Sequence, residues 1–343
     1  MQNPLSANFP LSKTGWPWTY SYQPLPPTMP NGVSCPRISI VTPSYNQSAY
    51  LEETIRSVLL QGYSNLEYII IDGGSTDGSI DIIRKYAHHL AYWISEPDAG
   101  QSDAINKGWK RATGDWVAWI NSDDRYLPNT FARIAEVSSQ QSSIGLIFGQ
   151  LELLFDDHPH IIGYATLSEH MLEALDLPYQ QTCFFKRAVL EKIGLLDPSL
   201  HYAMDADLLL RVMASTDWFY LPAPLASFRI RRGTKTSTSE EKFARELLIL
   251  LERILSQRVR YPKLQALTDS ELRCTFYRRA SKHFYMGNHF RESLIMILQA
   301  IKANPPAFFS ILQDEGMGWM TRRLMPPMLY RQLSAFYRSK PIT

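Results

Sequence analysis

The sequence has few of the features that mark disulfide-rich, zinc-binding or membrane-spanning proteins. Its 343 residues include three cysteines, Cys35, Cys183 and Cys274, and no CxxC pair. An odd number at wide spacing argues against a disulfide framework or a zinc cluster. No apolar run reaches the ~18 residues that a membrane-spanning helix needs. The start also lacks the basic-then-apolar pattern of a signal peptide, so we expect a protein of the reducing cytoplasm.

The usual glycine-rich nucleotide-binding loops are missing as well. No Gly-x-Gly-x-x-Gly follows the first expected strand, and there is no Walker-type loop with Gly-Lys-Ser. A nicotinamide or ATP site is therefore disfavoured, and we expect no nucleic acid partner. A nucleotidyltransferase would usually carry a glycine-rich loop with Arg or Lys after its first strand. This chain has Pro43-Ser44-Tyr45-Asn46 there, so that class is a minor alternative.

Charge is divided unevenly along a chain whose overall charge is only +2. Residues 229–343 hold 21 Lys/Arg and nine Asp/Glu, whereas residues 1–228 hold 14 Lys/Arg and 24 Asp/Glu. An acidic front and a basic end indicate two different roles. In the last segment basic residues interleave with aromatic and aliphatic ones, a pattern that can lie on an anionic bilayer. This basic C-terminus could contact a membrane peripherally or pack on the chain's own domain, and the sequence is compatible with both.

Three parts follow from the patterning: an N-terminal arm (1–36), an α/β domain (37–238) and a helical C-terminal region (239–343). The arm holds eight of the 22 prolines and several aromatics, so we expect it to be extended and packed along the domain. The second part alternates expected strands at residues 38–42, 66–71, 91–94 and 116–120 with amphipathic helices. Near-continuous apolar strands separated by helices predict an α/β fold, with a mostly parallel sheet covered by helices on both faces.

Acidic side chains follow three successive expected strands. They are Asp72 after the second strand, Asp98 after the third, and Asp123-Asp124 after the fourth. Ligands of open α/β sheets bind beyond the carboxyl ends of the strands, and Mg²⁺ or Mn²⁺ takes one or two carboxylates plus phosphate oxygens. The sequence therefore predicts a metal–diphosphate site, although Asp98 fits a turn equally well. Without a metal, Asp72 could accept a hydrogen bond from a base or ribose.

Several of these segments together resemble the family-2 glycosyltransferases, which have the GT-A fold. The segments that carry the resemblance are residues 38–47 (ISIVTPSYNQ), 68–78 (YIIIDGGSTDG), 98–100 (DAG), 104–108 (AINKG), 119–124 (WINSDD) and 201–211 (HYAMDADLLLR). They occur in the family's usual order. The resemblance covers about residues 37–235 and leaves out the C-terminal helices. It implies a GT-A, Rossmann-like sheet with a C-terminal helical appendage.

The resemblance also implies roles for individual residues. Mn²⁺ or Mg²⁺ would be ligated by Asp123, by Asp124 or by both. Asp205 falls on the acid that serves as general base toward the acceptor, although it is also a suitable first-turn acid for its helix. The residues expected to bind the donor are Pro43, Tyr45, Asn46, Asp72, Asp98, Lys107, Asn121, Ser122 and Arg231.

Three positions depart from the family pattern. Asn121 replaces the first acid of the Asp-x-Asp motif, Met204 replaces a Glu, and Arg231 stands where His is frequent. The expected activity is inverting transfer of a sugar from a nucleoside diphosphate sugar, UDP first among the candidates, to a glycan or lipid-linked acceptor. Bacterial surface polysaccharide or glycoconjugate synthesis is the expected setting, in the cytoplasm or peripherally on the inner membrane face. The alternative is a catalytically silent scaffold that binds a sugar nucleotide or a polysaccharide.

Overall fold

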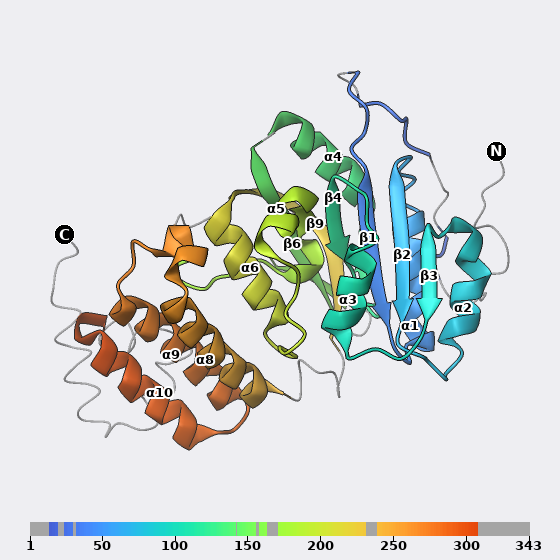
Figure 1. The fold of residues 1–343 in the computed structure, drawn as a ribbon. Coiled ribbons are helices and arrows are strands. Elements are labelled where there is room, and N and C mark those ends of the chain that lie inside the picture. The colour runs from blue at the N-terminus through green and yellow to red at the C-terminus, as the bar shows by residue number, and fades with distance from the viewer. Residues whose placement is uncertain are drawn as a thin grey trace. The chain divides into compact units, whose positions relative to one another are not determined.

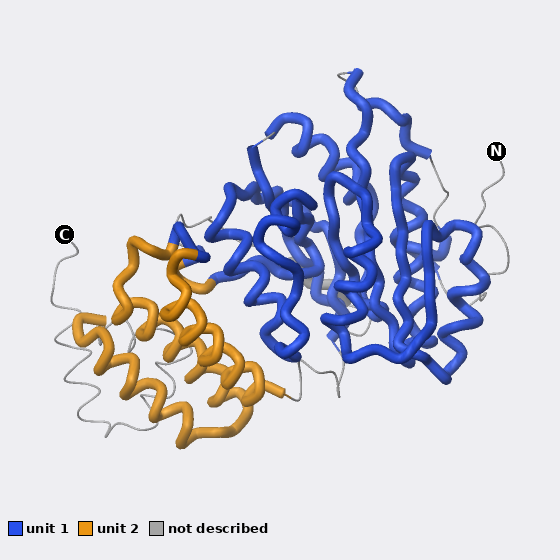
Figure 2. Tube along the Cα trace, viewed as in Figure 1, with its two compact units in different colours: residues 1–172, 176–234, 260–263 blue, residues 173–175, 235–259, 264–343 orange. Residues whose placement is uncertain are grey.

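A computed structural model describes residues 14–19, 24–29, 32–141, 143–155, 158–162, 171–230 and 239–307. The chain divides into two compact units (Figure 2). Unit 1 comprises residues 1–172, 176–234 and 260–263, and unit 2 comprises residues 173–175, 235–259 and 264–343. Each unit is described separately below. The boundaries predicted from the sequence for the arm (1–36), the catalytic α/β domain (37–238) and the helical C-terminal region (239–343) stay a prediction.

Unit 1 is built on one nine-stranded sheet (Figure 1). The strand order is β3-β2-β1-β4-β8-β6-β9-β5, and β7 pairs with β6. The strands are β1 (Ile38–Ser44), β2 (Leu66–Asp72), β3 (Tyr92–Ser95), β4 (Trp116–Trp119), β5 (Arg125–Tyr126), β6 (Ile144–Phe155), β7 (His158–Ile162), β8 (Phe184–Lys186) and β9 (Asp217–Ile230).

The sheet is mixed, and most of its strands run in one direction. Strands β1, β2, β3 and β4 pair in parallel, as do β6 and β9. Strand β8 is antiparallel to both β4 and β6, which makes β6 run in the direction of β1. Only β5, β7 and β8 oppose that direction among the described strands. The prediction of a mostly parallel GT-A-like sheet with C-terminal helices is confirmed.

Helices of unit 1 cover both faces of the sheet. They are α1 (Ser48–Leu59), α2 (Ser79–Tyr86), α3 (Gln101–Trp109), α4 (Thr130–Gln140), α5 (Arg187–Ile193) and α6 (Met204–Ser215). Ile40 of β1 shares a buried cluster with Leu51 and Ile55 of α1. The next residue, Val41, faces Gly108 of α3. Because successive side chains of a strand point to opposite faces, α1 and α3 lie on opposite faces of β1.

Described parts of the N-terminal arm lie against this unit. Trp18 is 4% exposed, and the indole Nε1 of Trp16 donates to the carbonyl of Tyr126 at 2.8 Å. The guanidinium of Arg56, itself 1% exposed, donates to the carbonyl of Pro17. The arm thus supplies a hydrogen-bond acceptor, the Pro17 carbonyl, to a buried arginine of α1.

Unit 2 is helical where it is described, as the sequence predicts. Its helices are α8 (Glu240–Ser256), α9 (Asp269–Met286) and α10 (Phe290–Ala303). The N-terminus of α9 has a capping box, in which Thr268 and Glu271 exchange side-chain and backbone hydrogen bonds. The hydroxyls of Ser281 and Ser293 lie 2.9 Å apart where α9 and α10 pack. Within the described residues no helix is long and apolar enough to cross a membrane. The predicted basic membrane-contacting segment lies outside the described residues.

The close approach of α3 to β1 generates a stability prediction. A Cβ added at Gly108 would lie 2.5 and 2.8 Å from the two γ-methyl carbons of Val41. Gly108→Ala should therefore lower the free energy of unfolding by about 1–3 kcal/mol, the usual cost of overpacking, as measured by urea denaturation.

Val41→Ala provides the matched test, because it removes the methyl carbons that the new Cβ would meet. The double variant should lose less stability than the sum of the two single losses. A Gly108→Ala protein with wild-type stability would show that the helix can move away from the strand without cost.

Candidate active site

The carboxyl ends of β1, β2 and β3 lie side by side at one edge of the sheet. In the strand register Ser44 is opposite Asp72, and Asp72 is opposite Ser95. Strand β4 runs parallel to β1 with Trp119 opposite Val41, so the loop after β4 leaves the same edge. The polar segments that the sequence placed after these strands therefore gather at this edge.

Asp72 holds the loop that follows β2. Its side chain is fully buried, and its Oδ2 accepts from the backbone N–H groups of Gly74 (3.1 Å) and Ser75 (2.8 Å) and from the Ser95 hydroxyl (2.7 Å). Its Oδ1 accepts from the Ser75 hydroxyl at 2.6 Å. Four hydrogen bonds use the acceptor capacity of one carboxylate. Asp72 thus positions the loop, and its direct contact with a nucleotide stays a prediction.

A bare glycine brings two of the predicted donor-binding residues together. A Cβ added at Gly73 would lie 2.6 Å from Oδ2 of Asp98 and 3.3 Å from the ring of Tyr45. The other oxygen of Asp98 accepts from the backbone N–H of Gly100 at 2.8 Å, so Asp98 does take part in a turn. Tyr45 is 63% exposed. An exposed aromatic ring and a carboxylate therefore border the same glycine, in the position where the sequence predicts the nucleotide.

Asn46 joins the loops after β1 and β2. It adopts a positive φ of 51°, its backbone N–H donates to Ser75 Oγ at 2.8 Å, and its Oδ1 accepts from the N–H of Thr76 at 2.9 Å. Pro43 is buried within β1 opposite Ile71. Both residues shape this edge, and their predicted contact with a donor is untested.

Lys107 on α3 reaches the residues that follow β3. Its Nζ lies 3.0 Å from Glu96 Oε1 and 3.4 Å from Asp103 Oδ2. The hydrogen bond that Lys107 donates to Glu96, followed by the charge of Asp103, raises the pKa of Lys107 above its usual range. The lysine is therefore a positive charge held by two acids, and its predicted donor role is untested.

Asp124 is a buried carboxylate surrounded by donors from three segments. It is 2% exposed, and its Oδ2 accepts from Asn121 Nδ2 (3.2 Å) and Gln181 Nε2 (3.3 Å). Its Oδ1 accepts from the backbone N–H of Arg229 at 3.1 Å. Burial, followed by the charge of Asp123, raises the pKa of Asp124 to about 8 although these hydrogen bonds lower it. A cation nearby would favour the ionised form.

The carboxylates of Asp123 and Asp124 suit a metal that also binds phosphate. Asp123 is partly exposed, whereas its neighbours Ser122 and Asp124 are buried. Across the residues that the structure describes, no cluster of three or more His, Cys, Asp or Glu side chains is placed to hold a metal. Two carboxylates with remaining positions for phosphate oxygens and water are typical of Mg²⁺ and Mn²⁺ sites, so the donor set fits such an ion.

Asp205 lies in the first turn of α6 and is partly exposed, with Oδ1 accepting from the N–H of Ala206 at 2.8 Å. Burial, with a smaller contribution from the charge of Asp205, raises the pKa of the Cys183 thiol. Cys183 follows η2 (Gln180–Thr182), which carries the Gln181 amide that reaches Asp124. The charge of Asp205 therefore acts on the residue that follows η2, and the role of Asp205 as a base stays a prediction.

Polar contacts to the preceding loop hold the start of α6. Asn106 of α3 exchanges hydrogen bonds with the backbone of Leu196, at 2.8 and 3.1 Å. Arg211 donates to the Asp207 carboxylate at 2.7 and 3.0 Å and also to carbonyls of that loop. Both pairs are buried. This packing fixes the helix end that carries Asp205.

Some site residues differ from the predicted set. Arg231 lies outside the described residues. Three contacts with the acidic residues were not predicted: Gln101 Nε2 donates to Asn121 Oδ1 at 2.8 Å, and Gln181 and the Arg229 N–H donate to Asp124. Amide side chains carry no sequence pattern of their own, and the Arg229 contact is made by a backbone N–H. Only the predicted strand-end position of Asp124 could have directed attention to them.

Asp124 makes the stability of the apo protein depend on pH. A group whose pKa is raised by folding stabilises most below its unfolded pKa of ~3.9, and this stabilisation is lost as pH rises through the folded value, here about 8. The wild type should therefore lose stability relative to Asp124→Asn between about pH 5 and 8, with a slope of at most about 1.4 kcal/mol per pH unit.

Melting temperatures of both proteins across this range provide the measurement. The exposed Asp217, which pairs with Lys263 on the surface, supplies the control variant Asp217→Asn, which removes a carboxylate outside the candidate site. A constant difference between wild type and Asp124→Asn would contradict the raised pKa.

Comparisons with known proteins agree on one family. A model described as glycosyl transferase family 2 matches residues 39–194. An uncharacterized glycosyltransferase of Mycobacterium tuberculosis is 32% identical over 182 residues, 52% of this chain and 69% of the relative. The putative teichuronic acid biosynthesis glycosyltransferase TuaG of Bacillus subtilis is 38% identical over 112 residues, 31% of this chain and 44% of the relative.

Solved structures share the fold at lower identity. S. aureus TarS 1–349 in complex with UDP-GlcNAc superposes with a TM-score of 0.60 at 18% identity, covering 88% of this chain and 91% of that one. The mannosyltransferase PcManGT from Pyrobaculum calidifontis, in complex with GDP-Man and Mn²⁺, gives a TM-score of 0.53 at 17% identity, over 85% and 91% of the two chains. Together with the sheet and its strand-end loops, these matches show that the chain is a GT-A-fold enzyme that belongs to glycosyltransferase family 2.

Proposed function

We propose that the chain is a metal-dependent, inverting hexosyltransferase that uses a nucleoside diphosphate sugar, with UDP as the first candidate nucleotide. The observation that carries the proposal is the buried Asp124 beside Asp123 at the strand ends, because a divalent cation would offset the cost of ionising a carboxylate there. The fold neighbours captured with UDP-GlcNAc, or with GDP-Man and Mn²⁺, support this choice of donor and metal.

The residues at the strand ends have separate roles in this proposal. Tyr45 offers an exposed ring against which a base can stack, and Asp98 offers a carboxylate acceptor beside it. Asp123 and Asp124 would hold Mn²⁺ or Mg²⁺, which when bound neutralises charge on the departing diphosphate. Lys107 supplies a positive charge at the same edge.

The chemical step is a single displacement. The Asp205 carboxylate takes the proton from an acceptor hydroxyl while that oxygen forms a bond to the anomeric carbon. The bond between this carbon and the diphosphate oxygen breaks, and the nucleoside diphosphate leaves. One displacement inverts the anomeric configuration, and no second carboxylate nucleophile is needed.

The acceptor proposed is a glycan or lipid-linked saccharide of bacterial surface polysaccharide synthesis. The relative named for teichuronic acid biosynthesis supports this class. A cytoplasmic protein, with peripheral membrane contact through the basic residues after 320, fits a lipid-linked acceptor and stays part of the proposal.

Donor binding is tested by a thermal-shift panel of UDP-, GDP- and dTDP-sugars, each with Mn²⁺ and then with EDTA. We expect one nucleotide sugar to raise the melting temperature and EDTA to abolish this rise. At 100 times its Kd, a bound ligand stabilises the folded protein by about 2.7 kcal/mol. The absence of a shift with every nucleotide would favour the silent-scaffold alternative and contradict the proposal.

The base is tested with Asp205→Asn. A positioned general base contributes about 10²–10⁴-fold, so this variant should lose that factor in kcat while its donor-induced thermal shift stays at the wild-type value. Asp217→Asn is the control and should transfer sugar normally. Transfer by Asp205→Asn at a near wild-type rate would show that another group removes the proton.

A further inference from the structure

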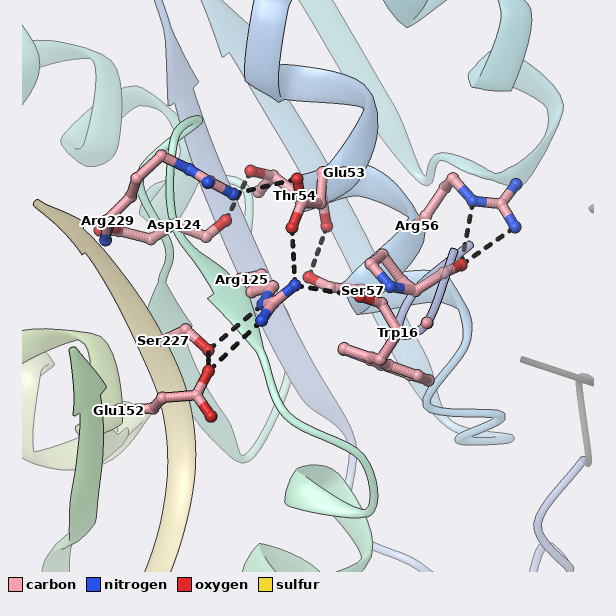
Figure 3. A network of polar contacts seen from close by, with 12 residues as sticks. Trp16, Glu53, Thr54, Arg56, Ser57, Asp124, Arg125, Glu152, Ser227 and Arg229 are labelled. Atoms are coloured by element: carbon pink, nitrogen blue, oxygen red, sulfur yellow. Dashed lines mark hydrogen bonds and ion pairs between the residues drawn. The ribbon is translucent and has the colours of Figure 1, made fainter. Parts of the chain in front are cut away.

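Four charged side chains, those of Glu53, Arg125, Glu152 and Arg229, form a network next to Asp124 (Figure 3). Glu53 of α1 binds two arginines, with Oε1 2.8 Å from Arg125 Nη1 and Oε2 3.0 Å from Arg229 Nη2. Arg125 also reaches Oε1 of Glu152 on β6 at 3.3 Å. Strands β5, β6 and β9 are thus joined to α1 through charged groups.

The network is largely withdrawn from water and its charges balance. The side-chain exposures are 14% for Glu53, 17% for Arg125, 13% for Glu152 and 20% for Arg229. Removing one partner of such a pair leaves an uncompensated charge, which is far more disruptive than losing a surface ion pair. Glu53 is the central member, because each of its oxygens serves a different arginine.

Arg229 of the network and Thr54, next to Glu53, both donate hydrogen bonds to Asp124. Arg229, whose side chain Glu53 holds, donates its backbone N–H to Asp124 Oδ1 at 3.1 Å. Thr54, the neighbour of Glu53 on α1, donates its hydroxyl to the Asp124 carbonyl at 2.6 Å. Arg125 follows Asp124 directly in the chain. The position of Glu53 is therefore transmitted to the carboxylate and to the backbone of Asp124.

Part of the network comes from outside the segment that matches the family. The match ends at residue 194, whereas Arg229 and Ser227 lie on β9, and Ser227 Oγ accepts from Arg125 Nε at 3.3 Å. Before the match begins, the carbonyl of Trp16 accepts from Arg125 Nη1 at 3.0 Å. The arm and β9 therefore both contribute hydrogen-bond acceptors to Arg125, which itself lies within the matched segment.

We propose that Glu53 is a positioning residue for the acidic site: it holds Arg125 and Arg229 so that the Arg229 N–H stays on Asp124 and fixes its carboxylate for a divalent cation. The effect on cation binding rests on the proposed metal-dependent function. The role of Glu53 in holding Arg229 against Asp124 does not. Glu53 itself touches neither the cation nor the substrate.

The test compares Glu53→Gln with Glu67→Gln in the full chain. Glu67 is a matched control, because it is a buried glutamate (5% exposed) that pairs with Arg37 at 2.9 Å and accepts a hydrogen bond from Thr113. It lies at the start of β2, away from the carboxyl ends of the strands where the candidate site is. Both variants should lower the melting temperature. Only Glu53→Gln should speed amide exchange at the end of β9 and raise the Kd for Mn²⁺ alone, by about tenfold, measured by electron paramagnetic resonance of free Mn²⁺ at pH 7.5.

A second variant covers the case in which Glu53→Gln fails to fold. Arg229→Lys keeps one positive charge opposite Glu53 but loses the planar fork, and it should show a smaller rise in Kd, two- to threefold, with the same faster exchange. If the variants match Glu67→Gln in Mn²⁺ affinity and in β9 exchange, the network is structural only and the inference is overturned.

Failure of the proposed function gives a different pattern of results. A wild-type protein that binds no Mn²⁺ would contradict metal dependence, while exchange at the end of β9 still decides whether Glu53 positions Arg229. Unchanged exchange in both Glu53→Gln and Arg229→Lys would overturn the positioning role irrespective of metal binding.

Discussion

A carboxylate buried to 2% exposure, as Asp124 is, needs hydrogen-bond donors on both oxygens or a nearby positive charge, because burial penalises the ionised form. Its donors come from the loop after β4, from η2 and from β9. These segments are far apart in the sequence, so the carboxylate has its partners only when the β4 edge, β8 with η2, and β9 are assembled. Burial of one acid therefore couples the local geometry of the site to the topology of the whole sheet.

The acids at the strand ends differ in what their surroundings leave available. Asp72 has its acceptors filled by its own loop and by Ser95, so its main effect is to hold that loop in shape. Asp124 is enclosed and has its pKa raised to about 8, and Asp123 beside it is partly exposed. Acids at neighbouring strand ends thus have different surroundings, although the sequence presents them in the same way.

The sequence predicted the elements whose information is local. The apolar runs of β1, β2 and β4 and the amphipathic stripe of α1 are visible because the side-chain period of each element is strong. Helix α4 and the two-residue β5 were not anticipated, and neither was the antiparallel direction of β8. Short strands take their pairing from distant partners. The same limit applies to the site. The position of Asp124 was predicted, but Gln181 and the Arg229 N–H, which lie 57 and 105 positions away, follow from the folded topology.

Asn121, which replaces the first acid of the Asp-x-Asp motif, is compatible with the burial of Asp124. Its Oδ1 accepts from Gln101, and its Nδ2 donates to Asp124. These two partners orient the amide, because reversing it would bring donor against donor and oxygen against carboxylate. An Asp at position 121 would lose the donor and place a third negative charge beside Asp123 and Asp124, which raises the cost of ionising a buried acid. An amide here keeps one acceptor and stabilises the neighbouring carboxylate, so the substitution and the burial of Asp124 support each other.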